Sequence, residues 1–281
     1  MMGRRTEASV ALRHSDTDDR PPGVANPLPS PMSATLTHAS DCSATDLAAA
    51  GISVRFQGLA AISEVDLTVR RGEVLGLIGP NGAGKTTLVN CLTGHQRPSE
   101  GRILLGQMDI TGWSPQKFRR AGVARTFQSG RLFKDMTVLE NVETTAVGLG
   151  RSRRAAAREA MDALDWLGVA DSAERLAGVL PYTDERRVAI ARALVVPPEY
   201  LLLDEPAAGM SDSECDELLG FVNEIPGRYG CGVLLIEHNM RVVMNSCSRI
   251  VVLDGGRRIA EGTPEAVQKE PGVISAYLGE G

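Results

Sequence analysis

Aromatic residues and long apolar runs are both scarce in this chain. Phe, Trp and Tyr make up 4% of its 281 residues, and apolar runs such as Tyr200 to Leu203 are far shorter than the roughly 18 residues that span a bilayer. A hydrophobic content of 43% is nevertheless ample for a buried core. We therefore expect a folded protein, and any role at a membrane should be peripheral.

A basic excess is absent as well. The formal net charge is −5, whereas proteins whose main partner is nucleic acid or an anionic membrane surface usually present a basic face. The cationic run RSRRAAAR at 151–158 is more simply the solvated start of a helix. We expect no nucleic-acid partner.

Cysteine occurs without the spacing of a metal or redox site. No Cys-x-x-Cys pair and no nearby histidine at metal spacing occurs among the five cysteines, which are Cys42, Cys91, Cys215, Cys231 and Cys247. Reduced structural thiols in the cytosol are the simplest interpretation, and we expect no metal site beyond Mg²⁺. Arg4 and Arg5 are not followed by an apolar segment, so the sequence predicts no secretory signal.

The first 46 residues have too little apolar content to fold. Residues 1–46 are rich in Ser, Thr, Asp, Pro and Ala, and repeated prolines interrupt any periodicity. We expect a disordered tail here, followed by one domain over residues 47–281. Met32 lies inside this tail and precedes every recognisable motif, so our hypothesis is that Met32 is an alternative start to Met1.

Short strands, and then strands alternating with helices, follow the tail. Three runs are typical of an antiparallel edge region that leads into a core: 52–56, 65–69 and 74–78. Helical periodicity covers two stretches, 151–176 and 181–195. Strands and helices then alternate at 200–203, 213–225, 233–236, 239–246 and 250–253. This order predicts an α/β fold with a mostly parallel sheet and a ligand at the carboxyl ends of its strands.

A glycine-rich segment matches the phosphate-binding loop pattern G-x-x-x-x-G-K-[ST] at every constrained position. It consists of Gly79, Pro80, Asn81, Gly82, Ala83, Gly84, Lys85, Thr86 and Thr87. The glycines let backbone N–H groups converge on phosphate oxygens, Lys85 reaches the terminal phosphates, and the Thr86 hydroxyl can hold Mg²⁺. The segment therefore predicts a nucleoside triphosphate and Mg²⁺ as ligands.

An apolar strand that ends in two acids is the expected companion of this loop. In Leu201-Leu202-Leu203-Asp204-Glu205, the first carboxylate would orient the Mg²⁺ shell and the second would polarise the attacking water. Many strands end in acidic loops, so this pattern is informative because the phosphate-binding loop is present too. We predict Glu205 as the general base of ATP hydrolysis.

With these motifs in this order, residues 51–281 resemble the ATP-binding-cassette (ABC) ATPases. The resemblance implies a P-loop NTPase cassette with a RecA-like core, a mostly parallel sheet, an antiparallel β edge subdomain and an α-helical subdomain at about 135–190. It also implies that the protein hydrolyses ATP to ADP and phosphate.

Three further residues match markers of that family. Phe56 lies 29 positions before Lys85, where such cassettes carry an aromatic that stacks on adenine, although a strand aromatic packed in the core is the alternative. Gln128 resembles the glutamine that contacts Mg²⁺ and the attacking water. His238 resembles the switch histidine that contacts the γ-phosphate.

Longer stretches are similar to the ATPase subunits of branched-chain (hydrophobic) amino-acid uptake transporters. They are LIGPNGAGKTTLVNCLTG at 77–94, ARTFQSGRLFKDMTVLENV at 124–142, DEPAAGM at 204–210, EGTP at 261–264 and AYLG at 276–279. This resemblance implies a cassette dimer docked on two membrane permease subunits at the cytoplasmic face of the membrane, with an external solute-binding protein. An importer of another small solute, of the amide or urea type, is the alternative.

The family's signature segment is altered in this chain. Where such cassettes have Leu-Ser-Gly-Gly-Gln or Leu-Ser-Tyr-Gly-Gln, the residues here are Leu180, Pro181, Tyr182, Thr183 and Asp184. In the family this segment binds the γ-phosphate held by the opposite subunit. Pro181 removes a hydroxyl and an N–H, and Asp184 adds a carboxylate near an anion. We expect a weaker contact, hence a heterodimer with a second ABC ATPase subunit; a regulatory cassette with impaired hydrolysis is the alternative.

Two structural expectations accompany the altered segment. Thr183 as N-cap, with Asp184 and Glu185 in the first turn, would suit the helix that follows. Ser211 stands where the family's usual Asp lies, in the segment through which such cassettes contact each other.

Cassettes that act on DNA or ribosomes fit the chain poorly. DNA-repair cassettes insert a long coiled coil before the signature, whereas 52 positions without heptads separate Gln128 from Leu180. Ribosomal cassettes occur in pairs within one chain.

Overall fold

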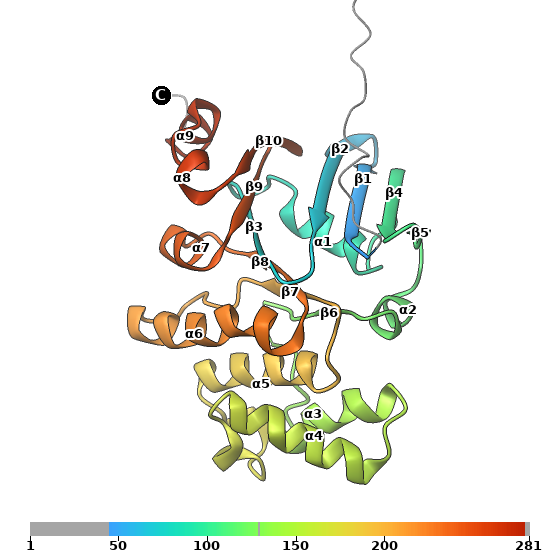
Figure 1. Cartoon of the computed structure of the whole chain (residues 1–281), viewed down its shortest axis with the longest axis vertical. Helices are drawn as coiled ribbons and strands as arrows, with labels where there is room; N and C mark the ends of the chain where they lie inside the picture. Colours follow the sequence, from blue (N-terminus) through green and yellow to red (C-terminus); the bar gives the residue numbers. More distant parts are fainter. Residues whose placement is uncertain (1–44, 129, 279–281) are drawn as a thin grey trace, which may run out of the picture. The chain divides into compact units, whose positions relative to one another are not determined.

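The computed structural model describes residues 45–128 and 130–278, so most of the predicted tail lies outside the described residues. Over the described residues the chain forms a four-stranded sheet in the order β2-β1-β4-β5 and a six-stranded sheet in the order β10-β9-β3-β8-β7-β6 (Figure 1). Helices pack against the sheets. The predicted α/β fold is confirmed.

The four-stranded sheet is antiparallel. Its strands are β1 (Leu47–Phe56), β2 (Leu59–Val69), β4 (Glu100–Leu105) and β5 (Met108–Asp109). Gln57 and Gly58 join β1 to β2 with φ of 49° and 89°, the positive values that a type I′ hairpin turn requires. The predicted strands at 52–56 and 65–69 are therefore the two arms of one hairpin, as an antiparallel edge region requires.

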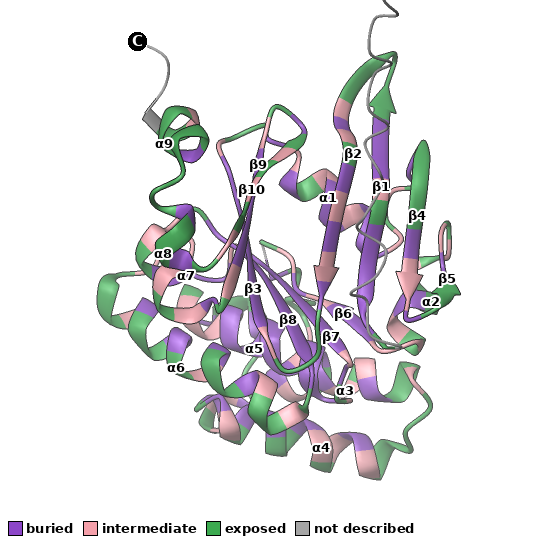
Figure 2. Ribbon diagram, turned by 45° about the horizontal axis from the view of Figure 1, so that its top comes forward, coloured by how far each residue is buried: buried purple, intermediate pink, exposed green. Residues whose placement is uncertain are grey.

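The six-stranded sheet is mostly parallel. Its parallel strands are β3 (Val74–Ile78), β6 (Val123–Arg125), β7 (Tyr200–Asp204), β8 (Gly232–Ile236) and β9 (Arg249–Asp254). At the edge, β10 (Arg257–Gly262) runs antiparallel to β9. Every residue of β3, β7 and β8 is buried (Figure 2), as expected for strands that are covered on both faces.

Alternate residues of the central strands enter two hydrophobic cores. On β3, Leu75 and Leu77 pack with the antiparallel sheet and α1 (Lys85–Leu92), whereas Val74 and Ile78 pack on the other face. The helices of that other face are α3 (Val138–Gly148), α4 (Arg153–Trp166), α5 (Tyr182–Leu194), α6 (Asp212–Tyr229) and α7 (Met240–Ser246). Because side chains alternate along a strand, the six-stranded sheet contributes side chains to both cores.

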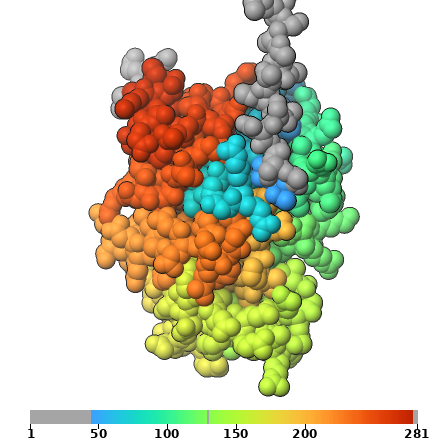
Figure 3. All heavy atoms as spheres, in the orientation of Figure 1, coloured from blue at the N-terminus to red at the C-terminus, as the bar shows by residue number. Residues whose placement is uncertain are grey.

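The helical subdomain differs from the continuous helix expected over 151–176. Ser152 caps α4, as the solvated helix start predicts, but α4 ends at Trp166 because Gly168, with φ of 69°, turns the chain. Two short 3₁₀ turns, Ala170–Ser172 and Ala177–Val179, then lead to α5. The helices α3, α4 and α5 pack on one another, and the yellow-green atoms of this region gather together in Figure 3.

Two residues of the predicted tail belong to the folded part. The Thr45 carbonyl accepts a hydrogen bond from the Tyr200 hydroxyl, and the Asp46 carbonyl accepts one from the Gly106 N–H at 2.7 Å. Tyr200 is fully buried, so the first contact ties the segment before β1 to β7. Thr45 and Asp46, at the end of the predicted tail, are therefore hydrogen-bonded to the domain that follows.

Three short helices complete the described part. They are α2 (Pro115–Arg120), which buries Phe118, and α8 (Pro264–Val267) and α9 (Pro271–Leu278), which follow β10. Within the described ranges, no helix combines the length and the apolar character needed to cross a membrane.

Candidate nucleotide-binding site

The phosphate-binding loop connects the end of β3 to the start of α1. Gly79, Gly82 and Gly84 have φ of 147°, 81° and 98°, values that glycine adopts at little cost. A Cβ on Gly79 would lie 2.0 Å from the Leu253 carbonyl oxygen, and one on Gly84 would lie 2.4 Å from a methyl carbon of Ile62. Close packing against β9 and β2 therefore requires glycine at two of these positions and holds the loop in place.

Lys85 lies across this loop. Its Nζ donates to the Gly79 carbonyl at 2.7 Å and to the Pro80 carbonyl at 3.0 Å. Burial lowers the pKa of Lys85, and the Glu205 and Asp204 carboxylates act in the opposite direction. The loop lines a cavity of about 200 Å³, and α1 begins there without a side-chain cap, so its first N–H groups can bind an anion.

The two acids lie at the end of β7, with Asp204 as its last residue, and the other predicted catalytic residues contact Glu205. Gln128 Nε2 donates to Glu205 Oε2 at 2.5 Å, and His238 Nδ1 lies 3.9 Å from Glu205 Oε1. Glu205 has a φ of 48°, an uncommon value for a residue with a side chain, and its N–H donates to the Ile236 carbonyl. The structure thus brings Lys85, Gln128, Glu205 and His238 together from four separate segments.

Asp204 forms an ion pair with Arg125, a partner that the sequence did not indicate. Arg125 Nη2 lies 2.6 Å from Asp204 Oδ2, and Arg125 Nη1 donates to Asn90 Oδ1 at 2.6 Å. Thr86 and Gln128 line the same cavity of about 640 Å³ as this pair. A hydroxyl, a carboxylate and an amide are oxygen donors of the kind that Mg²⁺ prefers. Arg125 places a positive charge at this carboxylate, as a bound Mg²⁺ would, so these residues fit the predicted cation.

Glu237 is a second residue of the site that no sequence motif indicated. Its carboxylate is buried and accepts hydrogen bonds from the Ala207 N–H at 2.9 Å and the His238 N–H at 3.2 Å. Burial raises the pKa of Glu237, and these N–H donors act in the opposite direction. Glu237 therefore connects the loop after Glu205 to the loop that carries His238. Its place directly after a buried apolar strand was an available signal.

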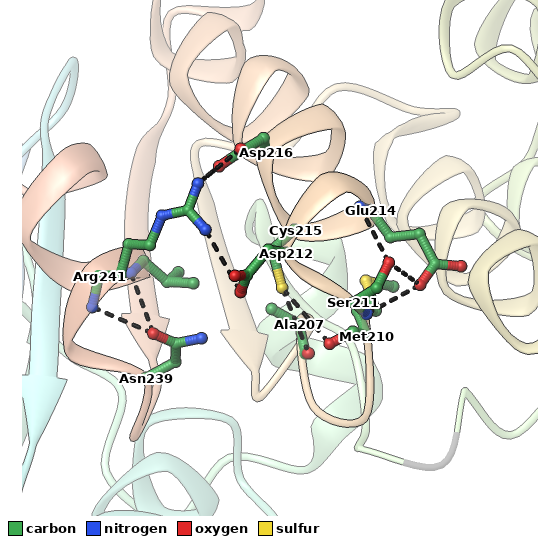
Figure 4. A network of polar contacts seen from close by, with 10 residues as sticks. Ala207, Met210, Ser211, Asp212, Glu214, Cys215, Asp216, Asn239 and Arg241 are labelled. Carbon is green, nitrogen blue, oxygen red and sulfur yellow. Dashed lines mark hydrogen bonds and ion pairs between the residues drawn. The ribbon is translucent and has the colours of Figure 1, made fainter.

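The loops beyond these residues are anchored by polar contacts between α6 and α7 (Figure 4). Asn239 caps α7 by accepting the Arg241 N–H at 3.0 Å, and the Arg241 side chain binds Asp216 at 2.6 Å and Asp212 at 3.3 Å. The Cys215 thiol contacts the Ala207 carbonyl at 3.9 Å. These contacts fix the segment that follows Glu205 and the segment that follows His238.

Phe56 stands apart from the other predicted residues. It lies at the end of β1 with half of its surface exposed and belongs to neither hydrophobic core. The core alternative for this aromatic is therefore wrong. The hairpin reaches the loop through Ile62, which packs against Gly84.

The altered signature segment begins α5, but not as expected. The helix starts at Tyr182 with Pro181 as N-cap residue, so the prediction of Thr183 as N-cap is wrong. Proline suits this position because its fixed φ is compatible with the start of a helix and because it has no N–H that would need a hydrogen-bond partner. Thr183 lies inside the first turn and its hydroxyl donates to Glu214 Oε1 at 2.5 Å. Asp184 lies in the first turn, as predicted.

Ser211 is explained by the helix that it begins. Its hydroxyl accepts the Glu214 N–H, and the Glu214 carboxylate accepts the Ser211 N–H at 2.8 Å, which is a reciprocal capping box. Hydrogen bonds from Thr183 and Ser211 lower the pKa of Glu214 to about 2. Glu214 therefore connects the signature helix α5 to the start of α6.

Family models match two segments of the chain. Residues 62–208 match the model described as ABC transporter, and residues 257–281 match the model described as branched-chain amino acid ATP-binding cassette transporter.

Similar proteins cover most of the chain. It is 45% identical over 249 residues to the high-affinity branched-chain amino acid transport ATP-binding protein LivG of Salmonella typhimurium, across 83% of this chain and 98% of that protein. The corresponding protein BraF of Pseudomonas aeruginosa is 43% identical over the same shares. A crystal structure of a nucleotide-free ATP-binding cassette from an ABC transporter, 31% identical, superposes with a TM-score of 0.77 over 84% of this chain and 100% of that one.

A cassette solved in its ADP conformation, 32% identical, gives a TM-score of 0.76 over 84% of this chain and 99% of that one. The chain therefore belongs to the ABC transporter family of ATP-binding cassettes, and it is an ATPase.

Proposed function

We propose that this chain is the ATP-hydrolysing subunit of an importer for branched-chain or other hydrophobic amino acids. The observation that carries the hydrolytic role is the meeting of Gln128, Glu205 and His238 beside the phosphate-binding loop. The solute class follows from the match over residues 257–281 and from the likeness to LivG and BraF, whose names state branched-chain amino acid transport.

Each residue of the site has a distinct role in this proposal. Lys85 and the loop N–H groups bind the phosphates, and the exposed Phe56 ring stacks on adenine. Glu205 accepts a proton from the attacking water, which Gln128 orients. His238 contacts the γ-phosphate. When the attacking water binds between the two side chains, it replaces the hydrogen bond from the Gln128 amide to Glu205 Oε2.

Thr86, Gln128 and Asp204 would hold Mg²⁺, partly through water. When bound, Mg²⁺ would neutralise charge on the phosphate oxygens during transfer. The residues of this chain then determine where the nucleotide lies and which water is activated.

The partners in this proposal are two membrane permease subunits, an external solute-binding protein and a second ABC ATPase subunit. The chain would work peripherally, at the cytoplasmic face of the membrane. The altered signature supports pairing with a different cassette: Pro181 brings no hydroxyl, and the Thr183 hydroxyl is already bound to Glu214. An intact signature in the partner would complete the site built on Lys85 and Glu205.

Solute uptake by intact cells tests this function. In cells that carry the chain with its transporter partners, Lys85→Ala should abolish uptake of radiolabelled leucine and leave uptake of urea unchanged. Lys117→Ala, on the surface helix α2, is the control and should transport normally. Loss of urea or amide uptake with normal leucine uptake would instead support the alternative importer.

A further inference from the structure

We propose that the Arg125 guanidinium takes the place of the divalent cation at Asp204 until Mg·ATP binds. Arg125 is then a positioning residue that sets how strongly the site distinguishes Mg·ATP from free ATP. This inference rests on the proposed role of Asp204 in the Mg²⁺ shell.

The backbone brings these two side chains together by strand pairing. β6 lies parallel to β7 with Arg125 opposite Leu202, and the Thr126 N–H donates to the Leu202 carbonyl at 2.9 Å. Arg125 therefore ends its strand at the same sheet edge at which β7 ends in Asp204. Although 79 positions apart in sequence, their charged groups lie 2.6 Å from each other.

Burial makes this ion pair different from the surface pairs of the molecule. The side chains of Arg125 and Asp204 are 6% and 10% exposed, so water screens their charges little. Arg125 Nε is buried and has no hydrogen-bond partner among the described residues. The guanidinium is thus held by its two terminal nitrogens, one on Asp204 and the other on Asn90. A buried carboxylate without a cation would be costly, and Arg125 meets that need in the empty site.

The surroundings allow Arg125 to give up the carboxylate without leaving the site. Its guanidinium lies over the Phe127 ring, 4.7 Å from the centroid, and Asn90 would keep its second nitrogen. The cavity of about 640 Å³ beside the pair also contains Thr86 and Gln128, the other predicted Mg²⁺ residues. A divalent cation that binds Asp204 there repels the guanidinium, so the two cations compete for one carboxylate.

Nucleotide binding with and without Mg²⁺ tests the competition. The purified full chain is titrated with mant-ATP in excess MgCl₂ and in EDTA. The ratio of the Kd in EDTA to the Kd in MgCl₂ is then compared between variants. Arg125→Gln keeps a hydrogen-bond donor beside Asp204 but removes the charge. It should weaken binding in EDTA, strengthen binding in MgCl₂ and raise the ratio by about tenfold or more, as expected for a close charge pair.

Arg131→Gln is the matched control. Arg131 lies over the same Phe127 ring, 4.1 Å from the centroid, and lines the same cavity, but it makes no ion pair with Asp204. Its ratio should stay within about twofold of the wild-type value. An unchanged ratio in Arg125→Gln, or an equal rise in Arg131→Gln, would overturn the inference.

Thermal unfolding without nucleotide provides a second measurement that needs no nucleotide binding. MgCl₂ should leave the Tm of the wild-type chain unchanged because Arg125 occupies Asp204, and it should raise the Tm of Arg125→Gln. A Mg²⁺-dependent rise in the wild-type chain would refute the competition even if the variant does not fold. Failure of the wild-type chain to bind mant-ATP in MgCl₂ would instead count against the proposed function.

Discussion

Glu205 has an unusual backbone conformation for a residue with a side chain. Its φ of 48° costs energy in a residue with a Cβ, yet the N–H bond to Ile236 and the contact with Gln128 hold it there. This conformation turns the chain directly after β7, so that the Glu205 carboxylate lies beside the phosphate-binding loop while Asp204 stays buried. The two neighbouring acids can therefore do different work.

Replacing the Glu205 carboxylate should separate binding from hydrolysis. In Glu205→Gln we expect mant-ATP affinity close to wild type and a kcat lower by about 10²-fold or more in the assembled transporter, because the proton acceptor is lost and the phosphate contacts remain. Phosphate release measures kcat. Glu174→Gln, an exposed glutamate of the helical subdomain, is the control. Equal kcat in Glu205→Gln and wild type would remove Glu205 from its proposed role.

Buried thiols give a prediction at neutral to mildly alkaline pH. Burial raises the pKa of Cys91 and Cys247 to about 12 and that of Cys231 to about 11, and it also raises the pKa of Cys215. Because the thiolate is the reactive form, these thiols should not react with Ellman's reagent at about pH 8 while the chain is folded. The assay uses Cys42→Ser, since Cys42 lies outside the described residues. Four thiols should react in urea, and rapid reaction of the native chain would contradict this burial.

Among the elements, the segment before β1 is hydrogen-bonded to β7 of the six-stranded sheet. Deleting residues 1–44 should leave the Tm nearly unchanged, since the composition of that segment does not favour folding. Deleting residues 1–46 should lower stability by about 1–3 kcal/mol, because the carbonyls that pair with Tyr200 and Gly106 are lost. Tyr200→Phe should reproduce part of that loss. Equal Tm values for the two deletions would show that these contacts contribute little.

In the whole molecule, we expect the signature segment to affect the ATP site that this chain forms with a second cassette. If each ATP is held by one subunit's loop and the other's signature, this chain weakens the site on its partner's loop but not the site on Lys85. A change of Pro181→Ser, Thr183→Gly and Asp184→Gln together should therefore raise ATP turnover at the partner's site and leave the Lys85 site unchanged. Single-turnover measurements with Glu205→Gln in this chain isolate the partner's site.

Two controls bear on that prediction. Thr183→Gly alone removes the contact with Glu214 and adds a helix glycine, which should cost about 1 kcal/mol of stability without restoring the signature. It separates destabilisation from gain of function. An ATP-dependent homodimer of this chain that hydrolyses as fast as the assembled transporter would contradict the proposed asymmetry.

Strands β1, β2, β3, β7, β8 and β9, the phosphate-binding loop and the two acids at the end of β7 could be predicted from the sequence, because they depend on residues that are neighbours in the chain. Strands β4, β5, β6 and β10 were not predicted. Alternation along a strand and the conformational freedom of Gly79 or Gly84 are local properties. Local patterns failed where a distant contact decided the outcome, as at Thr183, whose hydroxyl binds Glu214 instead of capping its own helix.

Which distant side chains meet depends on the tertiary structure. The pairing of β6 with β7 brings Arg125 to Asp204, 79 positions away, and the loop after β8 brings Glu237 to the Ala207 N–H, 30 positions away. No periodicity relates such residues, because their contact depends on strand order and register. The physical reason is burial: a charged group removed from water requires a partner, and the fold determines which partner is within reach.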